Sequence, residues 1–130
     1  MDAVVLFEVK PPRVRVGSDR YTWQADFDVV FQGVPVDLQV EFVQGLHRFK
    51  DADWEQTGNI VTLHFEFNLS SIKDWTGPTE SSGRKLVFPR EHQKQSAEVT
   101  ITWADGRKTF TVEAFPPSSM FVGRTDIISN

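Results

Sequence analysis

The strict alternation of apolar and polar residues between Tyr21 and Phe31 constrains the fold more than any other feature of this sequence. Six apolar residues occupy every second position, and the positions between them hold mainly threonine, glutamine and aspartate. Successive side chains of a β-strand point to opposite faces, whereas the apolar residues of a helix recur every three or four positions. The segment is therefore predicted to be a strand with one buried face and one solvated face.

A second alternating segment follows at residues 34–42, directly after Gln32-Gly33. Glycine behind a polar residue favours a tight turn between two strands. A hairpin that turns at these two residues places Phe27 opposite Leu38, so that apolar residues meet along the whole pair. We therefore expect the segments 21–31 and 34–42 to be hydrogen-bonded neighbours.

A second hairpin is predicted near the end of the chain. Residues 99–103 and 110–114 both alternate, and Asp105-Gly106 lies in the segment that joins them. Both central residues of a type I′ turn need positive φ, which aspartate and glycine tolerate best. A turn of this type places Thr100 opposite Thr111.

Shorter patterns predict further strands. Residues 60–69 alternate from Val61 onward, and weaker strands are predicted at residues 3–9, which are mostly apolar, and at residues 13–16, which alternate. Pro11-Pro12 separates the last two segments, and proline is confined to sheet edges because it cannot donate to a ladder. Residues 86–88 form one more short apolar run. The chain shows no amphipathic helix of ordinary length.

These patterns add up to about eight strands, and turn signals recur at the spacing of sandwiches and barrels. The predicted fold is an all-β, antiparallel β-sandwich, and a small β-barrel is the alternative. The proline-split first strand and the paired hairpins resemble immunoglobulin-type sandwiches. At 130 residues the chain is expected to form one domain, 1–130, with residues 116–130 as a C-terminal tail.

The composition argues against some classes of binding partner and some cellular compartments. The chain has no cysteine and a net charge of −4, which argues against general attraction to nucleic acid or to anionic membranes. Its start, Met1 to Glu8, lacks the basic residues and continuous apolar run of a signal peptide. We therefore expect a soluble protein in the cytoplasm, and no sequence motif indicates a cofactor.

The predicted first hairpin brings Asp28 opposite Asp37, and like charges so placed are destabilising. Solvation, or a neighbouring strand that carries Arg13 and Arg15, is the first explanation. A divalent cation and a basic partner surface are the alternatives, since hard cations prefer several oxygen ligands.

A second acidic run, at Asp51, Asp53 and Glu55, resembles the start of a calcium loop. The EF-hand pattern needs glycine at its sixth position and glutamate at its twelfth, where this chain has Gln56 and Thr62. The EF-hand interpretation is therefore rejected, and no metal site is predicted. The remaining weak metal candidates are Asp28, Asp37, Asp51 and Asp53.

Catalytic signatures are missing from the sequence. None of the three histidines is spaced from another as zinc ligands on one element are, and there is no G-x-S-x-G elbow. The sequence therefore favours a protein that is not an enzyme. A hydrolase whose site is assembled only by the fold is the least favoured alternative.

The leading hypothesis is a non-enzymatic module that binds another protein or a second copy of itself. Tryptophan gives a large contact area at little entropic cost, and two tryptophans lie at predicted turn or loop positions. A small barrel that binds an apolar small molecule or a carbohydrate is the alternative. The candidate binding residues are Trp54, Trp75, Arg84, Lys85 and Phe121.

Overall fold

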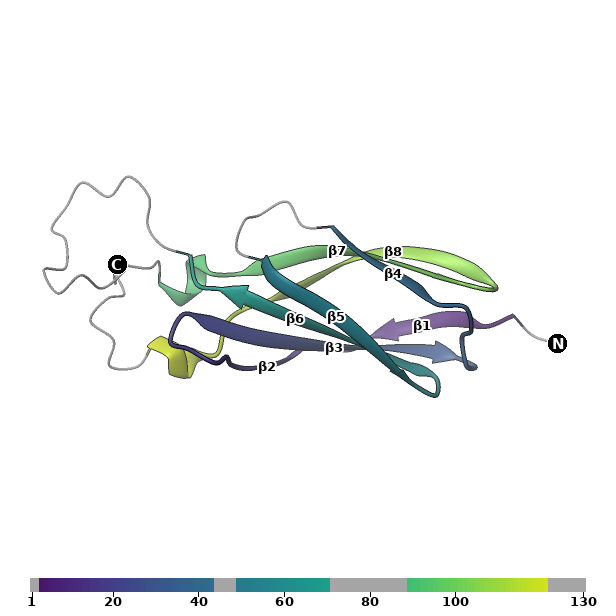
Figure 1. Ribbon diagram of the computed structural model, residues 1–130, viewed down its shortest axis with the longest axis horizontal. Helices are drawn as coiled ribbons and strands as arrows, with labels where there is room; N and C mark the ends of the chain where they lie inside the picture. Colours follow the sequence, from purple (N-terminus) through teal and green to yellow (C-terminus); the bar gives the residue numbers. More distant parts are fainter. Residues whose placement is uncertain (1–2, 44–48, 71–88, 122–130) are drawn as a thin grey trace, which may run out of the picture.

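Two antiparallel β-sheets pack face to face in the computed structural model, which describes residues 3–43, 49–70 and 89–121 (Figure 1). Sheet A contains β1 (Val5–Val9), β2 (Arg13–Val16), β3 (Thr22–Gln32), β5 (Phe49–Thr57) and β6 (Ile60–Asn68). Sheet B contains β4 (Gln39–Val43), β7 (Gln95–Trp103) and β8 (Gly106–Ala114). Two short 3-10 helices, η1 (Arg90–His92) and η2 (Ser118–Phe121), lie outside the sheets. Among the described residues, no helix is long and apolar enough to cross a membrane.

The strand order identifies the architecture. Sheet A runs β1-β3-β6-β5, β2 also pairs with β3, and sheet B runs β4-β7-β8. β1 and β2 lie end to end along one edge of β3, on either side of Pro11-Pro12. With β1 and β2 taken as one split strand, this is the order of constant-type immunoglobulin domains. The predicted sandwich is confirmed, and the barrel alternative is wrong because the described strands form two separate sheets, neither of which closes on itself.

The core lies between the sheets and is rich in aromatic residues. Phe65 on β6 lies at its centre, with ring contacts to four other phenylalanines. One of these, Phe42 on β4, belongs to the opposite sheet, so these contacts join the two layers. The buried apolar residues are Trp23, Ala25, Phe27, Val29, Phe31, Val61, Leu63, Phe65, Phe67, Leu69, Ala97, Val99, Ile101, Trp103, Val112, Ala114 and Met120.

The predicted first hairpin is wrong. After Gln32 the chain crosses to sheet B, where β4 pairs with β7, and β3 pairs with β6 instead. Val34 and Val36 in the crossing segment are each 56% exposed rather than buried. Alternation identifies a half-buried strand but does not identify its partner. β6 carries the same alternation as residues 34–42 and is the partner that the fold uses.

The second hairpin has the predicted strands but a different register. Thr100 lies opposite Thr109, and Trp103 lies opposite Gly106. The loop is therefore Ala104-Asp105, and neither of these residues has positive φ, so the type I′ turn is also wrong. The shift of two residues keeps every side chain on its predicted face, since the period of a strand is two.

β5 was not predicted as a strand. It covers the acidic run that resembled a calcium loop, and only Ala52 and Trp54 give it an alternating apolar face. A β-bulge between Phe49 and Asp51 interrupts the pattern and hides it from a search for strict alternation. β6, β1 and β2 match the other predicted strands, and residues 86–88 lie outside the described residues.

Candidate functional site

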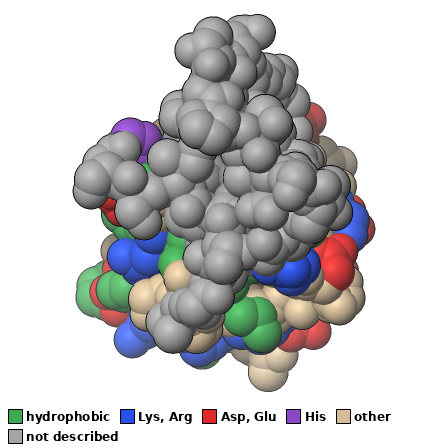
Figure 2. All heavy atoms as spheres, turned by 90° about the vertical axis from the view of Figure 1, so that its left-hand side faces the viewer, with side chains coloured by type: hydrophobic (Ala, Val, Ile, Leu, Met, Phe, Trp, Pro, Cys, Tyr) green, Lys and Arg blue, Asp and Glu red, His purple; other side chains and the backbone are tan. Residues whose placement is uncertain are grey.

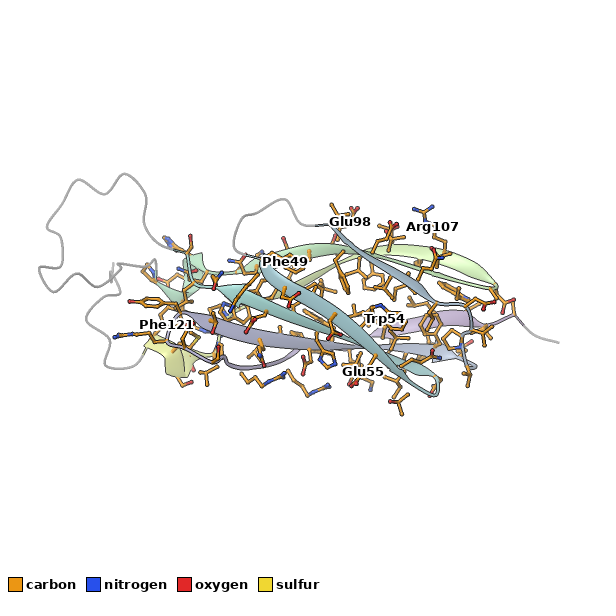
Figure 3. The ribbon with its side chains drawn as sticks, in the orientation of Figure 1. Phe49, Trp54, Glu55, Glu98, Arg107 and Phe121 are labelled. Atoms are coloured by element: carbon orange, nitrogen blue, oxygen red, sulfur yellow. The ribbon has the colours of Figure 1, made fainter. Side chains whose placement is uncertain are left out.

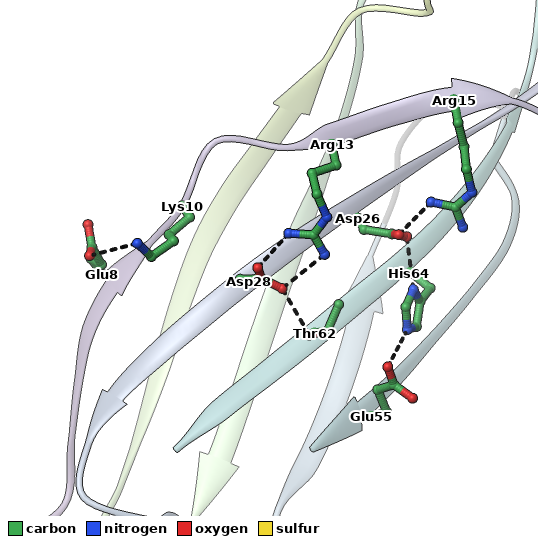
Figure 4. A network of polar contacts seen from close by, with 9 residues as sticks. All are labelled: Glu8, Lys10, Arg13, Arg15, Asp26, Asp28, Glu55, Thr62 and His64. Atoms are coloured by element: carbon green, nitrogen blue, oxygen red, sulfur yellow. Dashed lines mark hydrogen bonds and ion pairs between the residues drawn. The ribbon is translucent and has the colours of Figure 1, made fainter. Parts of the chain in front are cut away.

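A connected set of charged side chains covers the outer face of sheet A (Figure 4). At its centre Asp26 on β3 is only 7% exposed and accepts a hydrogen bond of 2.5 Å from Nη1 of Arg15 on β2. Nδ1 of His64 on β6 lies 2.8 Å from the other oxygen of Asp26. Nε2 of His64 lies 3.3 Å from Oε1 of Glu55 on β5. The contacts from Arg15 through Asp26 and His64 to Glu55 therefore connect four of the five strands of sheet A, namely β2, β3, β6 and β5.

A second set of hydrogen-bonded side chains lies two residues away along the same strands. Arg13 donates to both oxygens of Asp28, at 2.5 and 3.2 Å, and the hydroxyl of Thr62 donates to Asp28 at 2.9 Å. Asp28 lies opposite Thr62 in the sheet and Asp37 lies in the crossing segment, so the predicted opposition of the two aspartates is wrong. The prediction that arginines of a neighbouring strand compensate the β3 acids is confirmed.

These contacts shift the pKa values of the groups involved. Burial opposes ionisation of Asp26, but hydrogen bonds from Arg15 and His64 outweigh it and hold the pKa of this carboxyl below its usual 3.8. The hydrogen bond from Arg13 lowers the pKa of Asp28 in the same way. Burial opposes protonation of His64, but Asp26 and then Glu55 outweigh it and raise the pKa of the imidazole above 6.5.

The geometry suits charge pairing better than acid–base catalysis. Both ring nitrogens of His64 face carboxylates, so the protonated ring donates two hydrogen bonds, and neither nitrogen faces a hydroxyl nucleophile. Within the described ranges, no group of three or more histidine, aspartate and glutamate side chains is arranged to hold a metal ion. The weak metal candidates Asp51 and Asp53 lie on β5, on the outer face of sheet A.

An open depression of about 170 Å³ lies beside this network. Residues of β3, β5 and β6 form most of its lining. This lining carries four carboxylates but only one arginine and one histidine. Asp53 forms no ion pair within the part of the chain that the structure describes, whereas Asp26 and Glu66 are paired. The lining residues are Arg15, Gln24, Asp26, Asp51, Ala52, Asp53, His64, Phe65 and Glu66.

The same face ends in an apolar patch. Val5 and Phe7 on β1 are 44% and 59% exposed, and Phe7 is the unpaired residue of a β-bulge next to Glu8, which pairs with Val30. Val30 pairs with Ile60 on β6, and both alternate with buried residues, so they face outward beside Phe7. We call Val5, Phe7, Val30 and Ile60 the apolar patch.

The structure describes two of the five candidate binding residues that were predicted from the sequence. Trp54 lies on β5 rather than in a turn and is partly buried against the core, as is Phe121 in η2. Figure 3 shows Phe49 and Trp54 along β5, with Glu55 directed away from sheet B. Trp75, Arg84 and Lys85 lie outside the described residues. Their role in binding stays a prediction.

The end of the sandwich where η2 lies carries no single type of charge. Figure 2 shows that the described side chains visible there are acidic, basic and scattered hydrophobic residues. The outer face of sheet A is therefore the better organised surface among the described residues, because its charges are fixed by hydrogen bonds.

The network predicts a stability that falls at both ends of the pH range. His64 has a raised pKa, so its contribution is fully present below about 6.5 and is lost as the pH rises through the folded-state value. Asp26 and Asp28 have lowered pKa values, so their contribution is present above about 3.8 and is lost as the pH falls through the folded-state values. Urea unfolding across this range measures both effects.

A histidine NMR titration isolates the first effect. His64 should titrate above 6.5 in the wild type, and Asp26→Asn should lower that value because it removes the nearest negative charge. The variant Glu98→Gln, which removes a carboxylate on β7 in sheet B, is the control. A wild-type value at or below 6.5 would contradict the network.

Comparisons with protein families, with curated protein sequences and with solved structures find no significant match to this chain.

Proposed function

We propose that this domain is a non-enzymatic protein-interaction module that binds its partner through the outer face of sheet A. The observation that carries the proposal is the apolar patch, where Phe7 is 59% exposed, next to a charged network held in place by hydrogen bonds. Protein interfaces combine an apolar centre with a polar rim, and this face offers both in adjoining areas.

The charges of the face favour a basic partner. Arg13 and Arg15 are paired with Asp28 and Asp26, so the half of the face formed by β2 and β3 is close to neutral. The half formed by β5 and β6 carries the remaining carboxylates, among them Asp53 with no ion pair in the described structure. Complementary charge speeds association and excludes wrong partners.

Affinity capture from a native extract, with the purified domain as bait, tests this proposal. Phe7→Ser should reduce the retention of a specific partner by about tenfold, the loss expected for an aromatic residue at the centre of an interface. Val43→Ser is the matched control, because Val43 is 57% exposed but lies on β4 in sheet B. The dissociation constant of the purified partner then measures the same difference in solution.

Two outcomes would count against the proposal. One is retention that Phe7→Ser leaves unchanged. The other is a partner that Val43→Ser releases equally well, since that result would place the contact on sheet B. Light scattering separates a further case: a wild type that is dimeric and a Phe7→Ser variant that is monomeric would show that the partner is a second copy of the chain.

A further inference from the structure

We infer that the partner adds a β-strand to the edge of β5 that no described strand covers, called its free edge, and that this added strand alternates basic and apolar side chains. The inference rests on the proposed function, because it names the partner's chemistry and its mode of binding. Strand addition gains affinity from backbone hydrogen bonds and specificity from the alternating side chains.

The free edges of the two sheets differ in how well they could accept a strand. A β-bulge at Phe7 and the prolines Pro11-Pro12 interrupt the edge formed by β1 and β2, and β4 has only five residues. β8 has nine residues, but Lys108 lies opposite Ile101, so this edge carries an exposed charge on the core-facing side of the strand, a placement that discourages pairing. β5 also has nine residues, and its inward side chains from Ala52 to Trp54 are apolar.

The backbone of β5 has donors and acceptors directed at this edge. In an antiparallel pair, every second residue turns its N–H and C=O away from its partner strand. The N–H of Ala52 donates to Oδ1 of Asp51 at 2.8 Å, which indicates that Ala52 belongs to the set facing away from β6. Trp54, two residues further along, belongs to the same set. A strand added to this edge would displace the Asp51 carboxylate from the N–H of Ala52 and would hydrogen-bond to both residues.

The side chains of β5 define the chemistry of that strand. Asp51, Asp53 and Glu55 lie on the outer face, where side chains of the added strand would stand beside them. Ala52 and Trp54 face the core, and the alternate side chains of the added strand would meet them there. Lysine or arginine suits the first positions and aliphatic residues suit the second. The same carboxylates repel another copy of β5, so the edge excludes self-pairing.

A synthetic ten-residue peptide of alternating lysine and valine, labelled for fluorescence anisotropy, tests the inference. The wild-type domain should bind it, and a peptide of alternating glutamate and valine should not bind. Ala52→Pro should weaken binding of the lysine peptide by about tenfold or more, because proline removes a donor at the edge while the pairing of β5 with β6 is kept. Ala52→Ser, which keeps the N–H, is the matched control.

A second pair of variants tests whether binding requires the negative charge on β5. Asp53→Lys should also weaken binding by about tenfold, whereas Glu98→Lys makes the same change of charge on sheet B (Figure 3) and should leave binding unchanged. Hydrogen exchange provides a readout in the unmodified domain. The amides of Ala52 and Trp54 should gain protection when the lysine peptide binds.

The outcomes separate this inference from the proposed function. Peptide binding that is weakened by Asp53→Lys but unaffected by Ala52→Pro, with no new protection at Trp54, would overturn strand addition. Absence of peptide binding would overturn it as well. If Ala52→Pro does not fold, hydrogen exchange in the wild type decides the question. None of these results alters the loss of partner expected for Phe7→Ser, which tests the proposed function independently.

Discussion

Phe65→Ala should lower the free energy of unfolding by about 3–5 kcal/mol, the range for truncating a fully buried phenylalanine. Phe65 is 1% exposed and lies where the two sheets meet. Removing its ring leaves a cavity that β-strands held by two ladders cannot close, and it deprives four neighbouring rings of a contact. Those rings belong to Phe27, Phe42, Phe49 and Phe67, with centroids 5.2 to 5.7 Å from that of Phe65.

Urea unfolding at a fixed pH measures this loss, and Phe7→Ala provides the control. Phe7 has the same side chain but is 59% exposed, so its truncation should change the free energy of unfolding by about 0.5 kcal/mol or less. Comparable losses in the two variants would mean that Phe65 is not the centre of the core.

Gly17→Ala is expected to cost about 1–3 kcal/mol, through crowding rather than through a lost contact. Gly17 follows β2, and its N–H donates to the carbonyl oxygen of Thr22 at 2.8 Å. A Cβ atom at Gly17 would lie 2.8 Å from both the carbonyl carbon and the carbonyl oxygen of Thr22. Thr22 begins β3 and is buried, so relief requires the backbone of the β2–β3 turn to open.

A second glycine separates crowding from backbone strain. Gly58, in the β5–β6 turn, has φ of +61° and nothing within 4 Å of its Cβ position. Asparagine tolerates positive φ, so Gly58→Asn should be nearly neutral, whereas Gly17→Asn should be at least as damaging as Gly17→Ala. The midpoints of thermal unfolding compare the variants. A neutral Gly17→Ala would show that the turn adjusts freely.

Alternation allowed much of the fold to be predicted, but it could not supply the pairing of strands. β3 and β6 carry long, uninterrupted patterns, and both were recognised at nearly their observed lengths. The pairing of β3 with residues 34–42 failed because a match of apolar faces is common to every half-buried strand of a sandwich. β5 was missed because its bulge and its charges obscure a pattern of only two inward residues.

The candidate site depends on the pairing of β3 with β6, which alternation did not predict. Arg13 and Arg15 were predicted to compensate the aspartates of β3, because they alternate with apolar residues and therefore share the outward face of their strand. The bond between Asp26 and His64 could not be predicted, because it requires β3 to lie beside β6, which is distant in sequence. The alternation of residues 60–69 places His64 on the outward face of its strand, but no sequence signal connected His64 to Asp26.

The crossing of the chain from sheet A to sheet B also has a consequence for the order of folding. Among the described strands, three hydrogen-bonded pairs are neighbours in sequence, namely β2 with β3, β5 with β6, and β7 with β8. Such hairpins close short loops and can form within roughly microseconds. The pairing of β3 with β6 must close a loop that contains both β4 and β5, and a sandwich dominated by such non-local contacts folds in roughly milliseconds to seconds. The pairing of β3 with β6 at the centre of sheet A is therefore the folding step that joins three independent hairpins into one domain.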